Sequence, residues 1–361
     1  MTESPPRAWA EIDLSALHHN LAVARALSGK DVMAVIKAGA YGHGLEETAR
    51  ALDTCDLPFL GVANAREARR LARANIKTTP YILGATLPEE REEIAANGWT
   101  PCLCSVDEIA HFNQLGLTKP ISAHLALDTG MGRGGFLPDQ IPEALNALKS
   151  SPGIKLTGIG SHLPAADEDE EFTLNQIALF DEIVATIPKD MTPFHIHISN
   201  SAGLMKYHSA TSNLVRPGLL LYGISPFPEE QSKLKPVMSL KTRISLIHHL
   251  PKGHGVSYGR TLLSRDTKAA VLGIGYGDGF PRSLSEKGTE ILIKGKRCPL
   301  LGRVTMDQII VDVTDLSECQ TGDEAILFGA DLLVSDLAKK AGTIPWEILT
   351  QITPRVERRY L

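Results

Sequence analysis

The chain has 361 residues, of which 43% are hydrophobic and 22% charged, values typical of a soluble globular protein with two domains or one large barrel plus an addition. A net charge of −5 gives no reason to expect nucleic acid or an anionic membrane as a partner. No window holds the roughly 18 apolar residues of a membrane span, and the first residues lack the apolar core of a signal peptide, so we expect a cytoplasmic protein. The cysteines lack the paired spacing of a zinc site, so we expect free thiols and no metal.

Short apolar runs alternate with segments of helical spacing through the first two thirds of the chain. This alternation predicts parallel βα units, and eight of them predict a closed (β/α)₈ barrel, with an open doubly wound sheet as the alternative. The unit between Ser199 and Leu219 has the least regular pattern. The expected strands are Val32–Ala38, Pro58–Ala63, Pro80–Gly84, Pro101–Ser105, Ile121–Asp128, Ile154–His162, Phe194–Ser199 and Leu219–Gly223.

After Gly223 the helical spacing largely disappears and turn residues separate apolar runs. This pattern predicts a second, mainly β domain. We expect the barrel over residues 8–230 and the β domain over 231–361, with one helix at Ser335–Ala341. The early run Ala8–Ile12 is a candidate strand of the β domain. Its other expected strands are Ser239–Leu250, Ala269–Tyr276, Glu290–Lys294, Gln308–Val313 and Ala325–Phe328.

Chemically useful residues follow the expected barrel strands, at the end where barrel enzymes place their active sites. Lys37 ends the first strand, and an amine with little water around it can lose its proton and attack a carbonyl. That property suits a lysine that holds the aldehyde of pyridoxal 5′-phosphate (PLP). Small residues with free N–H groups at the later strand ends suit a phosphate. Taken singly, each feature has an ordinary structural interpretation, such as a lysine reaching into solvent or a turn.

The motifs taken together resemble the alanine racemases of bacterial type, which are PLP enzymes with an N-terminal (β/α)₈ barrel and a C-terminal β domain. The resemblance covers nearly the whole chain. The motifs that carry it are Arg7–Asp13, Ala16–Asn20, Val35–Gly44, Asp128–Arg133, Ser199–Gly203, Val215–Gly218, Leu221–Gly223, Val256–Thr261, Gly275–Gly279, Gly302–Gln308 and Thr353–Val356.

The resemblance implies a role for each matching residue. Lys37 would hold the cofactor and act as the base on one face of the substrate, and Tyr258 of the partner subunit of a homodimer would act on the other face. Arg216 would face the pyridine nitrogen, and His162 and His197 would link it to Tyr258. Arg133 would lie near the cofactor phenolate and the substrate carboxylate, and the backbone N–H of Met306 would help hold that carboxylate. The remaining residues expected to bind the cofactor, mainly at its phosphate, are Tyr41, Asn200, Ser201, Gly218 and Leu219.

The sequence departs from the family pattern at three positions that bear on the site. Many members carry a carbamylated lysine two residues before Asp128, where this chain has Ala126, so Arg133 needs another anion, such as Asp307, a chloride or the substrate. Gly39 replaces the usual asparagine of the lysine motif. Pro354 stands where some members have a tyrosine that binds the phosphate.

The resemblance implies a racemase that interconverts L- and D-alanine by two-base proton transfer and supplies D-alanine for peptidoglycan. Three alternatives remain open: a broad-specificity or serine racemase on the same scaffold, a PLP decarboxylase, and a non-catalytic PLP-binding protein. The decarboxylase would not need Tyr258 paired with Lys37, and the non-catalytic barrels lack the β domain. The side-chain preference of the substrate pocket cannot be derived from the sequence.

Overall fold

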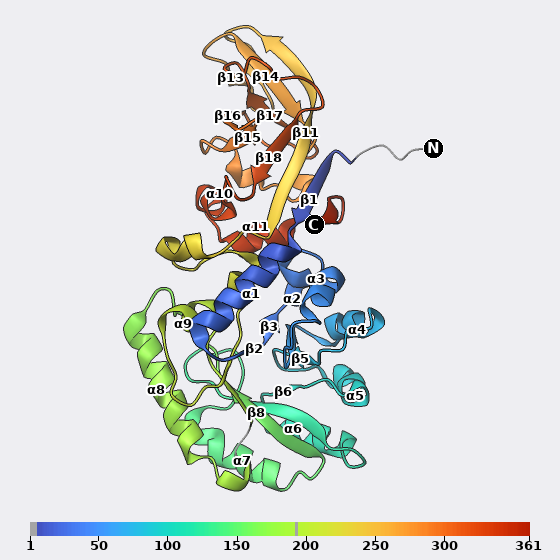
Figure 1. Ribbon diagram of the computed structural model, residues 1–361, viewed down its shortest axis with the longest axis vertical. Coiled ribbons are helices and arrows are strands. Elements are labelled where there is room, and N and C mark those ends of the chain that lie inside the picture. Colours follow the sequence, from blue (N-terminus) through green and yellow to red (C-terminus); the bar gives the residue numbers. More distant parts are fainter. Residues whose placement is uncertain (1–5, 192–193) are drawn as a thin grey trace. The chain divides into compact units, whose positions relative to one another are not determined.

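The computed structural model describes residues 6–191 and 194–361 and divides into two compact units (Figure 1). One unit comprises residues 18–40 and 45–234. The other comprises residues 6–17, 41–44 and 235–361. The short segment 41–44, which follows the lysine motif, therefore clusters with the C-terminal residues although it lies early in the chain.

The first unit is the expected barrel of parallel strands. Parallel pairing joins β3 to β4 and β5, joins β6 through β9, and joins β10 to β2. A bridge between Tyr81 and Thr100 and a bond from the Asn213 amide to the Ile196 carbonyl (3.0 Å) join these groups. The strands are β2 (Asp31–Val32), β3 (Ala34–Val35), β4 (Leu60–Val62), β5 (Pro80–Ile82), β6 (Cys102–Leu103), β7 (Ile121–Ala126), β8 (Ile154–Gly160), β9 (His195–His197) and β10 (Leu214–Val215).

The helices of this unit follow the strands in the order that the βα rhythm predicts. Their N-termini carry ordinary caps; for example, the side chains of Asn64, Ser105 and Asp169 accept backbone N–H groups of α4, α6 and α8. The α-helices are α1 (Leu14–Ser28), α2 (Lys37–Tyr41), α3 (Leu45–Leu52), α4 (Ala65–Arg73), α5 (Pro88–Asn97), α6 (Val106–Leu115), α7 (Ile141–Lys149), α8 (Glu170–Thr186) and α9 (Ser201–Lys206), and the 3₁₀ turns are η1 (Pro138–Gln140), η2 (Lys189–Met191), η3 (Leu219–Tyr222) and η4 (Pro228–Lys233).

The expected eighth strand at Leu219–Gly223 is wrong. The eighth strand is β10, at Leu214–Val215, and residues Leu219–Tyr222 form the 3₁₀ turn η3. The apolar run was misleading because Leu220, Leu221 and Tyr222 are fully buried in that turn, and a short buried run has the same composition in either structure.

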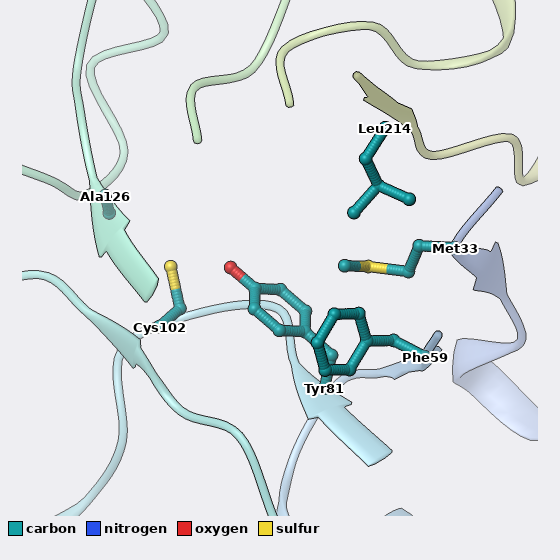
Figure 2. Packing of buried hydrophobic residues seen from close by; sticks show 6 residues of the cluster. All are labelled: Met33, Phe59, Tyr81, Cys102, Ala126 and Leu214. Carbon is teal, nitrogen blue, oxygen red and sulfur yellow. The ribbon is translucent and has the colours of Figure 1, made fainter. Parts of the chain in front are cut away.

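Inward-facing side chains from the barrel strands fill the barrel interior, as this fold requires. Figure 2 shows one such layer, in which the Tyr81 hydroxyl points toward the Cys102 sulfur. The members of the layer are Met33, Phe59, Tyr81, Cys102, Ala126 and Leu214.

The second unit is built around the long strand β11, which turns from one set of neighbours to another at a bulge between Ile244 and Leu246. Its first half pairs with β1 and β18 and its second half with β14, so that β11, β14, β17, β16, β15 and β18 close into a ring. The strand expected at Ala8–Ile12 is β1, and it pairs with β11.

The ends of the elements in this unit differ from the expected ones in a few places. The strand expected over Ala269–Tyr276 stops at Leu272, and β16 was not expected because it begins with two charged residues and contains Pro299. The elements are β1 (Ala8–Ile12), β11 (Met238–Leu250), β12 (Gly255–Val256), β13 (Thr261–Leu262), β14 (Thr267–Leu272), η5 (Tyr276–Asp278), η6 (Arg282–Leu284), β15 (Glu290–Ile293), β16 (Lys296–Leu301), β17 (Ile309–Asp312), β18 (Glu324–Phe328), α10 (Val334–Ala341), α11 (Pro345–Gln351) and β19 (Glu357–Tyr360). Among the described residues no helix combines the length and apolarity that crossing a membrane requires.

Candidate active site

Lys37 begins a left-handed turn directly after the first barrel strand. Ala38, Gly39 and Ala40 have φ of 54°, 63° and 56°, so the expected strand does not continue to Ala38. For a residue other than glycine this conformation costs roughly 1–2 kcal/mol, and it persists only where surrounding bonds impose it. Glu67 supplies such a bond, because its carboxylate accepts the Gly39 N–H at 3.0 Å. Strain of this kind beside the lysine is consistent with the functional position that the sequence predicts for Lys37.

The environment of Lys37 favours loss of its proton. Burial lowers the pKa of the amine, and the positive charges of Arg133 and Arg216 lower it further, while Glu67 opposes them. A lysine with a lowered pKa carries more of the unprotonated form that attacks a carbonyl. The structure thus supports the chemical role that the sequence suggested for this residue.

Arg216 lies in the barrel interior with neutral partners. Its Nη1 donates to His197 Nδ1 at 2.6 Å, and its Nη2 donates to the Ser161 carbonyl at 2.6 Å and to His162 Nδ1 at 3.1 Å. Burial lowers the pKa of Arg216, but a guanidinium starts above 12 and keeps its charge. Within the described part of the chain no carboxylate forms an ion pair with it. Of the expected chain from Arg216 through the histidines to Tyr258, the bonds from Arg216 to both histidines are present.

The expected phosphate ligands from the barrel meet between α9 and η3. Asn200 caps α9 by accepting the Gly203 N–H at 2.9 Å. The buried Ser201 hydroxyl accepts the N–H groups of Gly218 (3.1 Å) and Leu220 (3.2 Å), which brings the two loops together next to Leu219. Hydroxyl and backbone N–H donors are what a phosphate monoester needs. With the Lys37 amine, this donor set fits PLP.

Arg133 lies at the exposed tip of a loop after β7, and Asp128 holds that loop. One Asp128 oxygen accepts the N–H groups of Gly130, Met131 and Gly132 at 2.8–3.1 Å. Among the described residues Arg133 forms no ion pair, and Asp307 pairs with Arg355 at 2.7 Å instead. The β7 residue Ala126 packs in the core layer and offers no anion.

Tyr41 belongs to a segment that the C-terminal strand holds. Two nitrogens of Arg358 donate to the Gly42 carbonyl at 3.1 and 3.2 Å, and the Tyr360 hydroxyl donates to the His43 carbonyl at 3.2 Å. Burial raises the pKa of Tyr41 to about 12, so the phenol remains a hydrogen-bond donor at neutral pH. Sequence reasoning missed Arg358 because its contact with Gly42 joins residues more than 300 positions apart.

Tyr258 and Met306 lie in the β unit and are largely exposed. The Tyr258 side chain is 72% exposed and the Met306 side chain 52% exposed. Tyr258 stands between β12 and β13, at the edge of a hollow of about 300 Å³ that Thr305 and Gln308 also line. The hydroxyl of the neighbouring Ser257 donates to the Arg303 carbonyl at 2.7 Å, which fixes the turn.

We predict that removing the hydrogen bonds from Arg358 to the Gly42 carbonyl makes segment 41–44, which carries Tyr41, less ordered. Arg358 also donates to the carbonyls of Ile352, Thr353 and Val356, so Arg358→Gln should lower the free energy of unfolding by on the order of 3 kcal/mol. It should also weaken the retention of PLP during dialysis. Arg359→Gln on the same strand is the control. Equal PLP retention by the two variants would show that these hydrogen bonds do not matter for the cofactor.

Acid should destabilise the barrel through three histidines, two of them buried and one, His162, partly buried. Burial and the charge of Arg216 lower the pKa of His162 to about 3 from 6.5, and the pKa values of His124 and His197 are lowered as well. Below pH 6.5 the unfolded chain takes up protons that the folded chain refuses, so stability present at pH 7 is lost as the pH falls toward 3. His162 alone should remove about 2 kcal/mol between pH 7 and pH 5, and His124 and His197 should add to the loss in the same direction.

Urea unfolding at pH 7 and pH 5 measures this loss. His162→Asn should reduce the difference between the two pH values, whereas His208→Asn on the exposed surface should leave it unchanged. A wild-type protein equally stable at both pH values would contradict the prediction.

Comparison with known proteins agrees with this geometry over nearly the whole chain. Residues 12–226 match the family described as "Alanine racemase, N-terminal domain", and residues 237–360 match "Alanine racemase, C-terminal domain". The chain is 39% identical to an alanine racemase of Methylacidiphilum infernorum, over 98% of this chain and 93% of that protein. It is 36% identical to one of Halothermothrix orenii, over 98% and 96%.

Solved structures of the same name have the same fold. The alanine racemase of Clostridium difficile superposes with a TM-score of 0.92 at 32% identity, covering 99% of this chain and 97% of that one. The alanine racemase of Bartonella henselae, solved with covalently bound pyridoxal phosphate, gives a TM-score of 0.90 at 29% identity, covering 99% and 100%. The (β/α)₈ barrel with a C-terminal β domain is thereby confirmed. This chain belongs to the alanine racemase family.

Proposed function

We propose that this protein is a PLP-dependent racemase that interconverts L-alanine and D-alanine. The observation that carries the proposal is the half-buried Lys37 amine, which has a lowered pKa and lies in a strained turn of a family fold. The relative from Bartonella henselae that is solved with covalently bound pyridoxal phosphate supports the cofactor. The names of the relatives support the substrate.

The cofactor supplies an electron sink for the negative charge that develops on the substrate α-carbon. Lys37 would hold it covalently, and Ser201, Gly218, Leu219, Asn200 and Tyr41 would bind its phosphate. Arg216 would donate to the pyridine nitrogen. Since a guanidinium does not give up its proton, it disfavours protonation of that nitrogen and limits how much charge the ring withdraws. This restraint favours return of a proton to the α-carbon over side reactions.

Two bases on opposite faces of the α-carbon allow a proton to leave from one side and return on the other. Lys37 moves the proton on one face. Tyr258 moves it on the other face, and we propose that it comes from the partner subunit of a homodimer. The 72% exposure of Tyr258 in the single chain supports this arrangement, because the phenol is available to a second copy. Arg133 and the Met306 N–H would bind the substrate carboxylate.

The biological role follows from the reaction. We propose that the protein works in the cytoplasm and supplies D-alanine for peptidoglycan, which is the general role of the family.

Circular dichroism of purified protein incubated with L-alanine, L-serine or L-lysine in separate cuvettes tests the function. We expect the L-alanine signal to decay to zero fastest and the protein to absorb in the visible region from its lysine-bound cofactor. A stable L-alanine signal from cofactor-loaded protein would refute the proposal. Faster decay with L-serine would mean that serine is the preferred substrate of the same racemisation reaction.

The replacement of the family lysine by Ala126 leads to a prediction about carbon dioxide. Because no lysine is present there to be carbamylated, removing carbon dioxide and bicarbonate from all buffers should leave the racemisation rate unchanged. Rates in degassed buffer and after bicarbonate is added back provide the measurement. A marked loss that bicarbonate restores would mean that a carbamate forms elsewhere in the protein.

A further inference from the structure

The hydrogen bonds of Arg216 continue through His197 to a further imidazole, that of His124, in the barrel interior. His197 on β9 bonds to Arg216 through Nδ1, and its Nε2 lies 2.8 Å from Nδ1 of His124 on β7. Both imidazoles are buried, with exposed fractions of 2% and 0%. His124 touches neither Arg216 nor any expected ligand of the cofactor, and its role is unassigned by the proposed function.

Two glycines of β8 make room for these rings. A Cβ atom at Gly158 would lie 2.4 Å from the His124 ring, and one at Gly160 would lie 2.1 Å from Cε1 of His197. Any side chain at either position would displace an imidazole, since real Cβ contacts are longer than 3 Å. The strand between β7 and β9 therefore reserves space for the histidine pair.

The direction of the hydrogen bonds follows from Arg216. A guanidinium has donors only, so His197 must accept at Nδ1 and carry its proton on Nε2. That N–H donates to His124 Nδ1, and His124 must then carry its own proton on Nε2. Among the described residues this Nε2 has no hydrogen-bond partner. A buried unpaired donor costs about 1–3 kcal/mol. The histidine at position 124 is present despite this cost, which points to its Nδ1 acceptor as the useful group.

The surroundings of His124 keep it neutral. The titratable or charged groups that face it are Tyr81 from β5, His195 and His197 from β9, and Arg216 after β10. Phe59 packs edge-on against the ring at 5.1 Å. None of these is a carboxylate that would stabilise a second proton on the imidazole.

We infer that His124 is a positioning residue for Arg216, acting through His197. By accepting the His197 N–H, it stabilises the same tautomer of His197 that Arg216 requires and holds the ring orientation in which Nδ1 accepts from Arg216. The bonds of the Arg216 guanidinium to Ser161 and His162 do not depend on His124. Loss of His124 should therefore change the orientation of the guanidinium and leave it in the barrel interior. The inference rests on the proposed function, because the orientation of Arg216 matters through the pyridine nitrogen.

Three variants separate positioning from packing. His124→Asn keeps an acceptor oxygen near the place of Nδ1. His124→Gln moves its amide toward the place of Nε2, and His124→Leu fills the space without an acceptor. If positioning is the role, Asn should behave as wild type, and Gln and Leu should share a defect. Far-UV circular dichroism and the melting temperature show which variants fold. If His124→Leu does not fold, the comparison of His124→Asn with His124→Gln is sufficient.

The first readout is ¹⁵N NMR of cofactor-free protein labelled at histidine, with the His197 signal assigned by its loss in His197→Gln. Wild type and His124→Asn should show His197 as a single neutral tautomer protonated on Nε2. His124→Gln and His124→Leu should show a mixture of tautomers. An unchanged single tautomer in the Gln and Leu variants would overturn the inference, whether or not the protein is a racemase.

The second readout is the partition between racemisation and conversion of the bound cofactor to its amine form, followed by absorbance during turnover with alanine. We expect His124→Gln to raise the share of the side reaction by about tenfold, a shift that the loss of one hydrogen bond to a charged network can produce, and His124→Asn to match wild type. Equal partition in both variants would overturn the inference. A wild-type protein without racemisation would instead refute the proposed function and leave the NMR result standing.

Discussion

Lys37→Ala protein should neither racemise alanine nor keep PLP through gel filtration. The amine is the covalent attachment and one of the two bases, and removing a positioned base alone costs about 10²–10⁴-fold in rate. Loss of the attachment as well should bring the rate below detection. Absorbance in the visible region reports the cofactor, and circular dichroism reports racemisation.

Lys30→Ala is the matched control for this loss. Lys30 is also partly buried and donates to the Ser209 carbonyl at 3.1 Å, but it lies outside the site. It should keep both the cofactor and the activity. Racemisation by Lys37→Ala protein at more than about a hundredth of the wild-type rate would show that Lys37 is not one of the two bases.

Tyr258→Phe protein should keep its cofactor and lose about 10²–10⁴-fold in racemisation rate in both directions. The change removes one oxygen from a side chain that is 72% exposed, so folding should be unaffected. Lys37 still serves one face. In D₂O, one alanine enantiomer should therefore exchange its α-hydrogen without racemising, while the other should not exchange.

Proton NMR of L- and D-alanine in D₂O, run separately, measures this asymmetry. Tyr207→Phe, at the end of α9, should exchange and racemise as the wild type does. Full activity of Tyr258→Phe in both directions, or exchange of both enantiomers at equal rates, would mean that another group is the second base.

The barrel could be predicted because its signal is repeated. Seven of the expected strands overlap observed ones, and each brings its following residue to the same end of the barrel. The eighth could not be placed, because β10 has only two residues and the run after it is more apolar. Composition alone does not separate a buried turn from a buried strand.

The barrel residues of the site could be found because they lie at strand ends. The left-handed turn after Lys37 could not be predicted, since two of its residues are alanines, which rarely adopt positive φ. Glu67 acts through a bond to the Gly39 N–H, and His124 acts at the end of a chain of bonds. Neither leaves a local signal in the sequence. Tyr258 and Met306 came from the family resemblance alone.

Mixing two inactive variants tests the central claim, that Lys37 of one chain works with Tyr258 of another. Lys37→Ala and Tyr258→Phe homodimers, unfolded together in equal amounts and refolded with PLP, form heterodimers in half of the cases if pairing is random. Each heterodimer would contain one complete site, so the mixture should recover about a quarter of the wild-type activity. If Lys37 and Tyr258 of the same chain worked together, no site would be complete, and a mixture as inactive as its components would contradict the account.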